Sequence, residues 1–358
     1  MPDRTPRVLQ LLGPSTGGIR RHVSYLSEVL RRDGWDVDIA GPAGVLDGLD
    51  HVVEVPSGLG MGALRRARRS LGQIIDDYDL VHAHGLKAGW LATTISGRPP
   101  LVLSVHNLVL DEVAGRSAPV LRFLEERLPG RVDRTIAISS GVADRFVAAH
   151  GADRIVVIPP AGPPPSPSRT REQVRADLGL HDGDDLVVTA ARLNPQKDFE
   201  TLVEAARIAV RERPGLRWFV FGEGPSQDEV QHAAEAHGLE GVVVLAGPRP
   251  TVDDELAAAD VVAVTSRWES GPLVLLEALA LGQPVVSTRV GLAPDVIEPD
   301  VGRLVGVGDA SAFASALVDL LADPPDRAPG LTGSAARFAP DALVREVESV
   351  YRELTDAP

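Results

Sequence analysis

The chain alternates short, continuous runs of valine, isoleucine and leucine with amphipathic stretches of helical spacing, and this pattern most restricts its fold. In the first half we expect strands at 7–12, 35–41, 79–85, 100–107, 134–139 and 154–160. Helices are predicted between them at 17–34, 63–78 and 140–151. Strands that are apolar on both faces and separated by helices indicate a parallel sheet covered on both sides.

The same alternation restarts after residues 159–170, PPAGPPPSPSRT, the segment richest in proline, serine and glycine. Strands are expected at 184–193, 216–224, 242–247, 260–266, 284–288 and 302–309. Helices are expected at 198–213, 226–238, 253–259, 272–281 and 309–323. The pattern therefore predicts an α/β fold of two Rossmann-like, doubly wound domains.

The length of 358 residues also suits two domains. We place them at 1–162 and 163–338, followed by a tail at 339–358 with an amphipathic helix over 340–354. Ligands of doubly wound sheets bind beyond the carboxyl ends of the strands. If those two edges face each other, the site lies in a cleft between the domains.

The composition excludes several classes of protein. Cysteine is absent, which excludes disulfides, thiolate catalysis and cysteine-bound metals. No apolar run approaches the roughly 18 residues of a membrane span, and the N-terminal stretch contains no run typical of a signal peptide. The net charge of −14 argues against broad nucleic-acid binding. We therefore expect a cytoplasmic protein.

The negative charge is concentrated in the second half, because residues 1–165 carry a net charge of +1 and the remainder −15. An anion site there must use a few local cations. Arg192 and Lys197, in ARLNPQKDFETLVEA at 191–205, are separated by a loop that lets both reach one diphosphate. Lysine occurs only at 87 and 197, against 34 arginines, which favours a specific use of Lys197. The alternative is a solvated pair of loop charges.

The stretch RWESGPLVLLEALALGQPVVST at 267–288 has two carboxylates separated by seven residues. The helix is predicted to begin with Pro272 at its first position, so the N–H groups of Leu273 and Val274 have no helical partner and favour a phosphate. Glu277 lies in an apolar run, where an unpaired carboxylate is costly. It is expected to bind two ligand hydroxyls, or else a partner cation. Glu269 precedes the helix and is expected to face a sugar.

Three weaker signals follow other strands. Gly17 and Gly18, in GPSTGGIRRH at 13–22, allow the backbone to approach a phosphate or only form a tight turn. Gly222, in FGEGP at 221–225, lies under a nucleotide base or only turns the chain. His106 is placed to bind a sugar hydroxyl or to stabilise a developing positive charge, or it packs at a strand end. His82 and His84 share one face of a strand, lack a third ligand for a metal, and are interpreted as structural.

Together these motifs resemble the family 4 retaining glycosyltransferases of GT-B fold, over residues 8 to 354. The resemblance is carried by ESGPLVLLE, ARLNPQKDFETLVEA, FGEGP, AADVVAVTS, GGIRRHV and the tail helix. It implies that the first domain binds an acceptor and the second a nucleotide-diphosphate sugar. It also implies that the tail helix crosses back to the first domain, and that neither a metal nor another cofactor is required.

The resemblance also implies individual roles. Arg192 and Lys197 hold the diphosphate, the backbone of Leu273 and Val274 a phosphate, and Glu277 the ribose. Glu269 contacts the donor sugar, with His106 and Gly18 near the reaction centre. The expected catalytic residues are Arg192, Lys197, Glu269 and His106. The expected donor-binding residues are Gly17, Gly18, Arg192, Lys197, Gly222, Leu273, Val274 and Glu277. Where the family has Glu-Gly-Phe-Gly, this chain has Glu-Ser-Gly-Pro at 269–272, which leaves the sugar open.

The expected reaction is retaining transfer of a hexosyl group from a UDP- or GDP-sugar to a hydroxyl, for example of a lipid or cell-envelope glycan precursor. A nucleotide-sugar epimerase of GT-B type and a non-enzymatic two-lobed sugar-binding protein are the alternatives. The predicted helix ALRRARRSLGQII carries Arg65, Arg66, Arg68 and Arg69. These arginines either lie on the anionic inner face of a membrane or form a solvated face.

Overall fold

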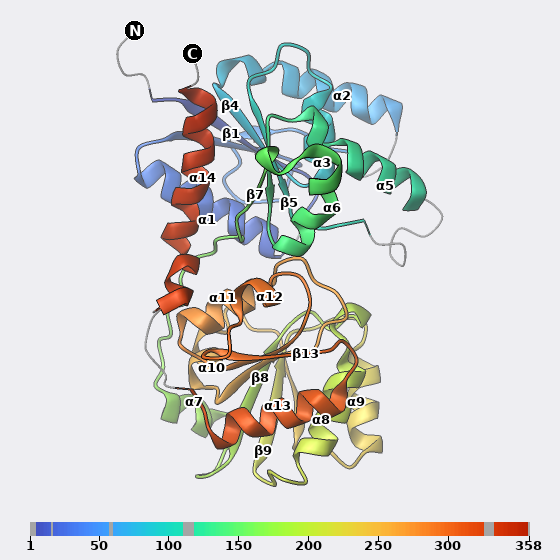
Figure 1. The fold of residues 1–358 in the computed structure, drawn as a ribbon, viewed down its shortest axis with the longest axis vertical. Coiled ribbons are helices and arrows are strands. Elements are labelled where there is room, and N and C mark those ends of the chain that lie inside the picture. The colour runs from blue at the N-terminus through green and yellow to red at the C-terminus, as the bar shows by residue number, and fades with distance from the viewer. Residues whose placement is uncertain (1–4, 16, 57–59, 110–117, 326–332, 357–358) are drawn as a thin grey trace. The chain divides into compact units, whose positions relative to one another are not determined.

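The computed structural model describes residues 5–15, 17–56, 60–109, 118–325 and 333–356. The chain forms two compact units, one of Met1–Pro163 with Pro340–Pro358 and one of Pro164–Ala339 (Figure 1). Each unit contains one parallel sheet flanked by helices. Two α/β units of this kind are what the alternation of apolar runs and amphipathic stretches predicts.

The sheet of the first unit has seven parallel strands among the described residues, in the order β3-β2-β1-β4-β5-β6-β7. The strands are β1 (Arg7–Leu12), β2 (Asp36–Gly41), β3 (His51–Val52), β4 (Leu80–His84), β5 (Leu101–Val105), β6 (Arg134–Ala137) and β7 (Ile155–Val157). The α-helices are α1 (Gly18–Arg32), α2 (Met61–Gly72), α3 (Leu86–Thr93), α5 (Ala118–Arg127), α6 (Ser140–His150) and α14 (Pro340–Thr355). Short 3₁₀ turns are η1 (Ile75–Asp77), η3 (Pro129–Arg131) and η4 (Ala152–Arg154).

The sheet of the second unit has six parallel strands within its described part, in the order β10-β9-β8-β11-β12-β13. The strands are β8 (Asp185–Ala190), β9 (Leu216–Phe221), β10 (Val243–Gly247), β11 (Val261–Val264), β12 (Val285–Thr288) and β13 (Gly302–Val305). The helices are α7 (Arg171–Asp177), α8 (Phe199–Ala209), α9 (Gln227–Ala236), α10 (Asp253–Ala258), α11 (Leu273–Ala280), α12 (Ala293–Val296) and α13 (Ala310–Ala322), with 3₁₀ turns η5 (Pro195–Lys197) and η6 (Gly333–Phe338).

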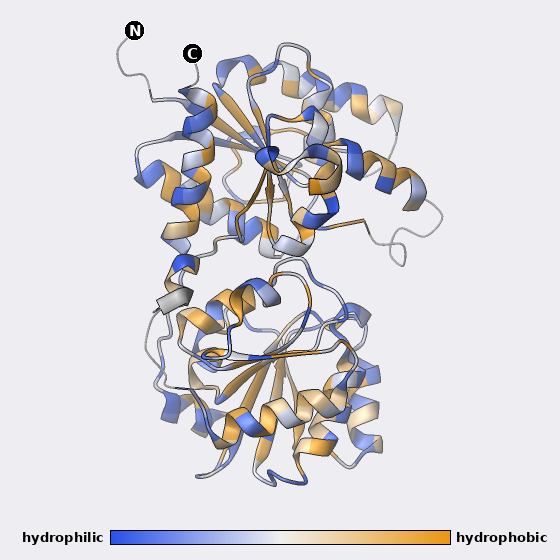
Figure 2. Ribbon diagram, viewed as in Figure 1, coloured by the Kyte–Doolittle hydropathy of each residue, from blue (hydrophilic) through white to orange (hydrophobic). Residues whose placement is uncertain are grey.

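The central strands of both sheets carry the apolar core. Leu9, Val81 and Leu103 are fully buried in the first unit, as are Val187 and Val261 in the second. Figure 2 shows the apolar residues concentrated on the strands and on the inner sides of the helices. In each sheet the strand order reverses beside the first strand, between β1 and β4 and between β8 and β11. Such switch points are where doubly wound sheets bind ligands.

Some elements differ from those predicted. The helix expected at 63–78 begins at Met61 and ends at Gly72, and the turn η1 follows it. Helices α3, α5, α7 and α12 and the two-residue strand β3 were not predicted. In α3 the cause is an interior glycine, which lowers helix propensity. A Cβ at Gly89 would lie 2.7 Å from Leu103 Cδ1, so close packing explains the glycine.

The tail forms helix α14, which packs against α1 and β4 of the first unit. Leu343, Val344 and Val347 of its apolar face are buried. Tyr25 donates a hydrogen bond to Asp341 at 2.8 Å, and Trp35 donates one to Glu348 at 3.1 Å. The prediction that the tail returns to the first domain is therefore confirmed. Among the described residues, no helix is long and apolar enough to cross a bilayer.

Candidate active site

The loops that follow β8 and β11 meet at the switch point of the second unit. The backbone N–H of Arg267 donates to Gln196 O at 2.8 Å, and Gln196 Nε2 donates to Trp268 O at 3.0 Å. Thr265 Oγ1 donates to Lys197 O at 2.8 Å. These hydrogen bonds hold two loops that lie about seventy residues apart in the sequence, so the side chains they carry have fixed neighbours.

Lys197 and Glu269 form an ion pair across these loops. Their side chains are only 17% and 10% exposed. Ser266 Oγ also donates to Glu269 Oε1, at 3.2 Å. Two residues predicted for one site are therefore in direct contact, and the Glu269 carboxylate is held by a cation and a hydroxyl.

Arg192 follows β8 and is exposed, and its guanidinium has no side-chain partner among the described residues. Its loop is fixed by the backbone, because Leu193 N–H donates to Glu223 O at 2.9 Å. A Cβ at Gly222 would lie 1.9 Å from Ala191 O. Glycine is therefore required at 222 for packing against the Arg192 loop, and contact of Gly222 with a donor stays a prediction.

Asp198 turns the chain between Lys197 and α8. It adopts the left-handed conformation, with φ of 52°, and it caps α8 by accepting hydrogen bonds from Thr201. Its carboxylate also binds Arg267 at 3.1 Å, and Glu200 lies 3.3 Å from the same guanidinium. Arg267, two residues before Glu269 in the sequence, is therefore neutralised by two carboxylates.

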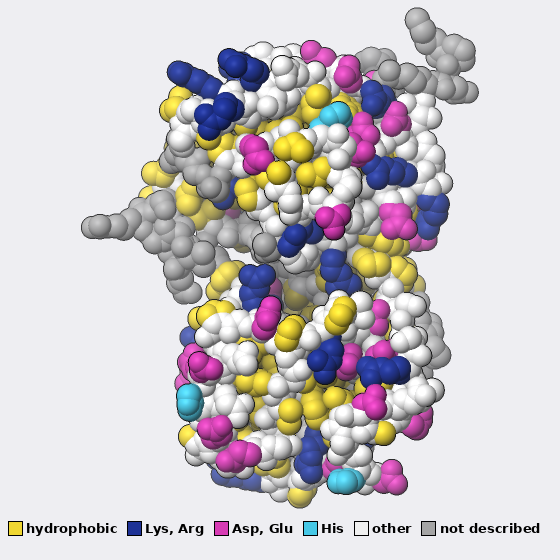
Figure 3. All heavy atoms as spheres, turned by 180° about the vertical axis from the view of Figure 1, so that it is seen from behind, with side chains coloured by type: hydrophobic (Ala, Val, Ile, Leu, Met, Phe, Trp, Pro, Cys, Tyr) yellow, Lys and Arg dark blue, Asp and Glu magenta, His cyan; other side chains and the backbone are white. Residues whose placement is uncertain are grey.

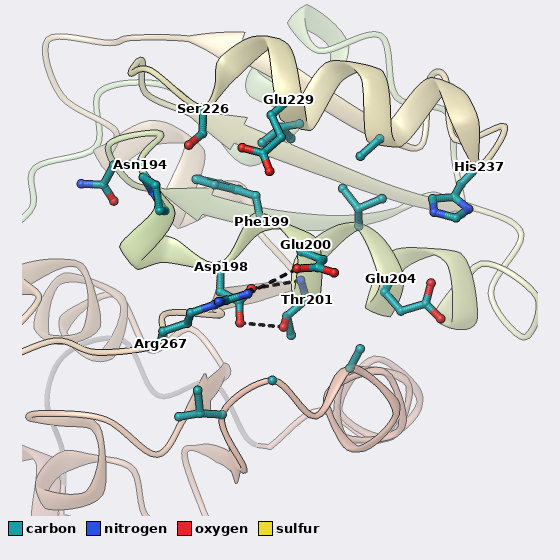
Figure 4. A pocket seen from close by; sticks show the side chains of 17 residues that line it. Asn194, Asp198, Phe199, Glu200, Thr201, Glu204, Ser226, Glu229, His237 and Arg267 are labelled. Carbon is teal, nitrogen blue, oxygen red and sulfur yellow. Dashed lines mark hydrogen bonds and ion pairs between the residues drawn. The ribbon is translucent and has the colours of Figure 1, made fainter. Parts of the chain in front are cut away.

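These side chains line a groove of the second unit, between α8, α9 and the loop before α13 (Figure 4). Its lining includes the carboxylates Asp198, Glu200, Glu204 and Glu229. Arg267 points toward Asp198 and Glu200 in this view. An acidic lining disfavours a diphosphate, and neither Arg192 nor Lys197 lines this groove.

Helix α11 begins at Leu273, and Pro272 is its N-cap rather than its first residue. The reason is that Pro272 has an extended ψ of 119°. Within the described residues, the N–H groups of Leu273 and Val274 have no protein partner. Glu277 is 8% exposed in the same helix. The two N–H groups leave the start of α11 available for an anion.

Gly291 is a residue that the sequence did not single out. Its φ is 51°, and a Cβ there would lie 2.4 Å from Glu269 O. The backbone of the loop after β12 therefore packs directly against the backbone of Glu269 and Ser270. No charge or spacing in the sequence marks this contact.

In the first unit, Gly17 and Gly18 lie at the start of α1. Gly17 is the N-cap, with φ of 63° and ψ of −126°, a conformation open mainly to glycine. Both glycines are exposed. His22 lies about one turn further along α1, and its ring packs against His106 with centroids 5.3 Å apart. The glycine loop and His106 thus belong to one region of the first unit.

A chain of hydrogen bonds joins His106 to the sheet. His106 Nε2 lies 3.1 Å from His84 Nδ1, and His84 Nε2 lies 2.7 Å from Gln10 Oε1. Gln10 Nε2 donates to the hydroxyl of Tyr351, in α14, at 2.9 Å. The chain continues from that hydroxyl to His82 Nδ1 at 2.5 Å.

The chain ends where His82 Nε2 meets Ser104 Oγ at 2.7 Å. Burial lowers the pKa of His22 to about 4, and burial together with neighbouring imidazoles holds the pKa of His82, His84 and His106 well below the usual range. All four rings are therefore neutral near pH 7.

Three ring nitrogens, of His22, His84 and His106, lie within 4.8 Å of one another. The sequence paired His84 with His82, whereas the structure groups it with His22 and His106; the interpretation of His82 and His84 as structural stays a prediction. Two of these rings face each other in the His84–His106 hydrogen bond. His22 Nδ1 lies 2.8 Å from Ala161 O.

The backbone after His106 is held by a buried carboxylate. Glu125, fully buried in α5, accepts a hydrogen bond from Val109 N–H at 2.6 Å and from Arg145 at 2.9 Å. Burial raises the pKa of Glu125, and these two donors oppose that rise. The residues between β5 and Val109 are thereby anchored to α5 and α6.

Helix α2 carries the basic patch, which consists of Arg65, Arg66, Arg68 and Arg69. All four side chains are exposed, and within the described residues none has a carboxylate partner. Figure 3 shows basic side chains gathered at the outer edge of the first unit, where α2 lies.

Comparison with protein families gives two matches. The model of "Glycosyl transferases group 1" matches residues 170–329, and the model of "Glycosyltransferase Family 4" matches residues 16–161. A protein of Nocardia farcinica named D-inositol 3-phosphate glycosyltransferase is 35% identical over 78% of this chain and 67% of its own length. A protein of Xylanimonas cellulosilytica with the same name is 32% identical over 95% of this chain and 92% of its own.

Solved structures share the fold. HepE of Anabaena, in complex with UDP, is similar with a TM-score of 0.80 and 21% identity, over 97% of this chain and 100% of that one. Sucrose-phosphate synthase of Thermosynechococcus elongatus is similar with a TM-score of 0.80 and 23% identity, over 98% and 100%. The predicted GT-B fold is thus confirmed, and on the family models and the sequence identity together, this chain belongs to glycosyltransferase family 4.

Proposed function

We propose that this glycosyltransferase moves a hexosyl group from a UDP- or GDP-sugar to an acceptor hydroxyl and retains the anomeric configuration. The observation that carries the proposal is the switch point of the second unit. There, the loop after β8 carries Lys197 and also Arg192, which has no carboxylate partner among the described residues. The loop after β11 leads to the start of α11, where two N–H groups have no protein partner within the described residues. Cations and a helix start are the groups that bind phosphates.

In this proposal the diphosphate is bound by Arg192, Lys197 and the backbone of Leu273 and Val274. Lys197 has three N–H donors, so it can keep its ion pair with Glu269 and still donate to a phosphate oxygen. The positive groups stabilise the leaving diphosphate, and its oxygen takes the proton of the acceptor hydroxyl. Because the protein supplies this charge, turnover is expected to be unchanged by EDTA.

The sugar-side roles are proposed for two carboxylates and for the first unit. Glu277 is proposed to accept the ribose hydroxyls, and Glu269 to contact the donor sugar. His106, with Gly17 and Gly18 near it, is proposed to lie at the reaction centre on the acceptor side. The names of the relatives state D-inositol 3-phosphate, which supports testing a phosphorylated polyol as the acceptor.

The first experiment is a thermal-shift panel of UDP, GDP, ADP and their sugars, because a ligand that binds the native state raises the Tm. HepE, which shares the fold, was solved in complex with UDP, and we expect UDP or GDP to give the largest shift. Arg192→Ala should reduce that shift, whereas Arg211→Ala, an exposed arginine after α8, should not. A panel without any nucleotide-dependent shift would contradict the proposed donor.

The second experiment separates transfer from epimerisation. The donor is incubated alone and with a phosphorylated polyol, and NMR reads the anomeric configuration of the products. Retaining transfer predicts a new glycoside of the donor's configuration only when the acceptor is present. An isomerised nucleotide sugar from the donor alone would indicate the epimerase instead, and an inverted glycoside would contradict retention.

We also propose that the basic patch of α2 binds an anionic membrane surface and brings the enzyme to a lipid-linked acceptor. The exposed arginines without ion-pair partners support this contact, since each basic residue near such a surface contributes about 1 kcal/mol. Flotation with vesicles that contain anionic lipid should recover the protein, and a variant with the four arginines changed to glutamine should be lost from them. Equal flotation with neutral vesicles would contradict an electrostatic contact.

A further inference from the structure

The hydrogen-bond chain from His106 to Ser104 has a defined direction. The amide of Gln10 fixes it, because Nε2 can only donate and Oε1 can only accept. Oε1 faces His84 Nε2 at 2.7 Å, so that nitrogen carries the proton of His84. A neutral imidazole has one N–H, and His84 Nδ1 is therefore an acceptor.

The direction extends to His106. Its Nε2 lies 3.1 Å from the bare Nδ1 of His84, so the proton between them belongs to His106 Nε2. His106 is neutral, and its Nδ1 must carry a lone pair. No described residue forms a hydrogen bond with that nitrogen, although His106 is only 4% exposed. The chain thus presents one acceptor nitrogen at its end.

The other side of Gln10 is consistent with this direction. The Tyr351 hydroxyl accepts a hydrogen bond from Gln10 Nε2 and therefore donates its own proton to His82 Nδ1. His82 then carries its proton on Nε2 and donates it to Ser104 Oγ. Gln10, His82 and Tyr351 are fully buried. An unmade hydrogen bond is costly at such a depth, so turning over the Gln10 amide requires every hydrogen bond in the chain to reverse together.

We propose that Gln10 and Tyr351 are positioning residues, which hold His106 in the tautomer protonated at Nε2 so that Nδ1 accepts a hydrogen bond from a substrate hydroxyl. Helix α14 thereby acts on a residue of the reaction centre through its single tyrosine, Tyr351. The link to catalysis rests on the proposed function, but the tautomer does not.

The direct test is NMR of the full chain with ¹⁵N-labelled histidine, with the His106 signals assigned by their loss in His106→Gln. The wild type should show an N–H at Nε2 and a bare Nδ1. Tyr351→Phe keeps the ring but removes the hydroxyl, so the Gln10 amide is free to turn over and His106 should shift toward the Nδ1–H tautomer. Gln10→Leu should produce the same change without altering α14.

The matched control is Tyr25→Phe. Tyr25 anchors the same helix through Asp341 at 2.8 Å but takes no part in the chain. It should leave the His106 signals unchanged, which separates positioning of the imidazole from attachment of α14. A wild-type His106 protonated at Nδ1, or unchanged His106 signals in both Tyr351→Phe and Gln10→Leu, would overturn the proposal.

The kinetic arm uses the same variants. Tyr351→Phe should lower kcat by about tenfold or more, because a wrongly protonated imidazole presents a donor where an acceptor is needed. The KM for the nucleotide sugar should stay unchanged, and Tyr25→Phe should retain kcat. If no transfer is observed with any acceptor, the proposed function fails while the NMR result still decides the tautomer. A full kcat in a Tyr351→Phe protein with the changed tautomer would refute the catalytic link.

Discussion

At the scale of single residues, the two proposed phosphate-binding cations are in different electrostatic states. Lys197 is paired with Glu269, whereas Arg192 is exposed and has no side-chain partner among the described residues. Removal of Arg192 deletes one cation. Removal of Lys197 deletes a cation and also leaves the carboxylate of Glu269, which is 10% exposed, without its ionic partner. Removal of Lys197 should therefore reduce activity more than removal of Arg192.

We predict that Arg192→Ala lowers kcat/KM by at least about tenfold, which corresponds to about 1.4 kcal/mol, and that Lys197→Ala lowers it further. Steady-state kinetics with the nucleotide sugar as the varied substrate measures both effects. Arg211→Ala controls for a general loss of positive charge. Near-wild-type turnover in both Arg192→Ala and Lys197→Ala would refute the diphosphate assignment.

The sequence identified Lys197 and Glu269 by rarity and spacing, but it could not show that they touch. That contact depends on hydrogen bonds between two loops, such as Thr265 to Lys197 O, which follow from no local pattern. Gly291 was missed for the same reason, because a side chain at this position would clash with the carbonyl of Glu269, which is distant in the sequence. His22 stood in the quoted glycine-loop motif, yet only the packing of α1 brings it to His106.

At the scale of elements, Asp198 fixes both ends of a turn. Its left-handed backbone conformation makes the turn between Lys197 and the first residue of α8. Its carboxylate caps α8 and forms an ion pair with Arg267. Helix capping by aspartate typically contributes about 0.5–2 kcal/mol. Because Asp198 precedes the helix directly, loss of its side chain should also loosen the loop that carries Lys197.

We expect Asp198→Ala to reduce the free energy of unfolding by about 1–2 kcal/mol, because alanine cannot cap and is strained at positive φ. Asparagine tolerates that conformation and still caps, and the pair with the 54% exposed Arg267 contributes little. Asp198→Asn should therefore remain within about 0.5 kcal/mol of the wild type. Urea unfolding of both variants provides the comparison, and equal losses in the two would contradict a capping role.

The elements that the sequence predicted well are those with strong, long patterns. The runs at 7–12 and 216–224 contain β1 and β9, and the amphipathic helices α1 and α14 lie within one or two residues of their predicted limits. Helix α3 was missed because Gly89, which serves packing against Leu103, masks its propensity. The start of α11 was misplaced by one residue because Pro272 fits both a helical and an extended conformation until its ψ is known.

At the scale of the whole molecule, the buried histidines of the first unit couple its stability to pH. Their pKa values are below the ordinary value when folded, to about 4 for His22. The unfolded chain therefore binds more protons than the folded one between pH 6.5 and about 4. The free energy of unfolding should be insensitive to these groups above about pH 6.5 and fall as the pH drops below it.

The expected slope is about 1.4 kcal/mol per pH unit for each histidine that takes up a proton only on unfolding. Denaturant unfolding between pH 4.5 and 7.5, followed by circular dichroism, measures it at about half-unit steps. His82→Asn should reduce the slope, and His237→Gln, at an exposed position of the second unit, should leave it unchanged. A free energy of unfolding that is constant across this range would show that the cluster is not buried in neutral form.

The return of α14 to the first unit has a consequence for biosynthesis. The second unit is continuous in the chain, at Pro164–Ala339, but the first is interrupted and is completed by residues that are translated after the second unit. During translation the second unit can finish folding while the first still lacks Tyr351, the hydroxyl that joins Gln10 to His82. The nascent N-terminal half can therefore complete its packing at α1 and β4 only after helix α14 has been translated.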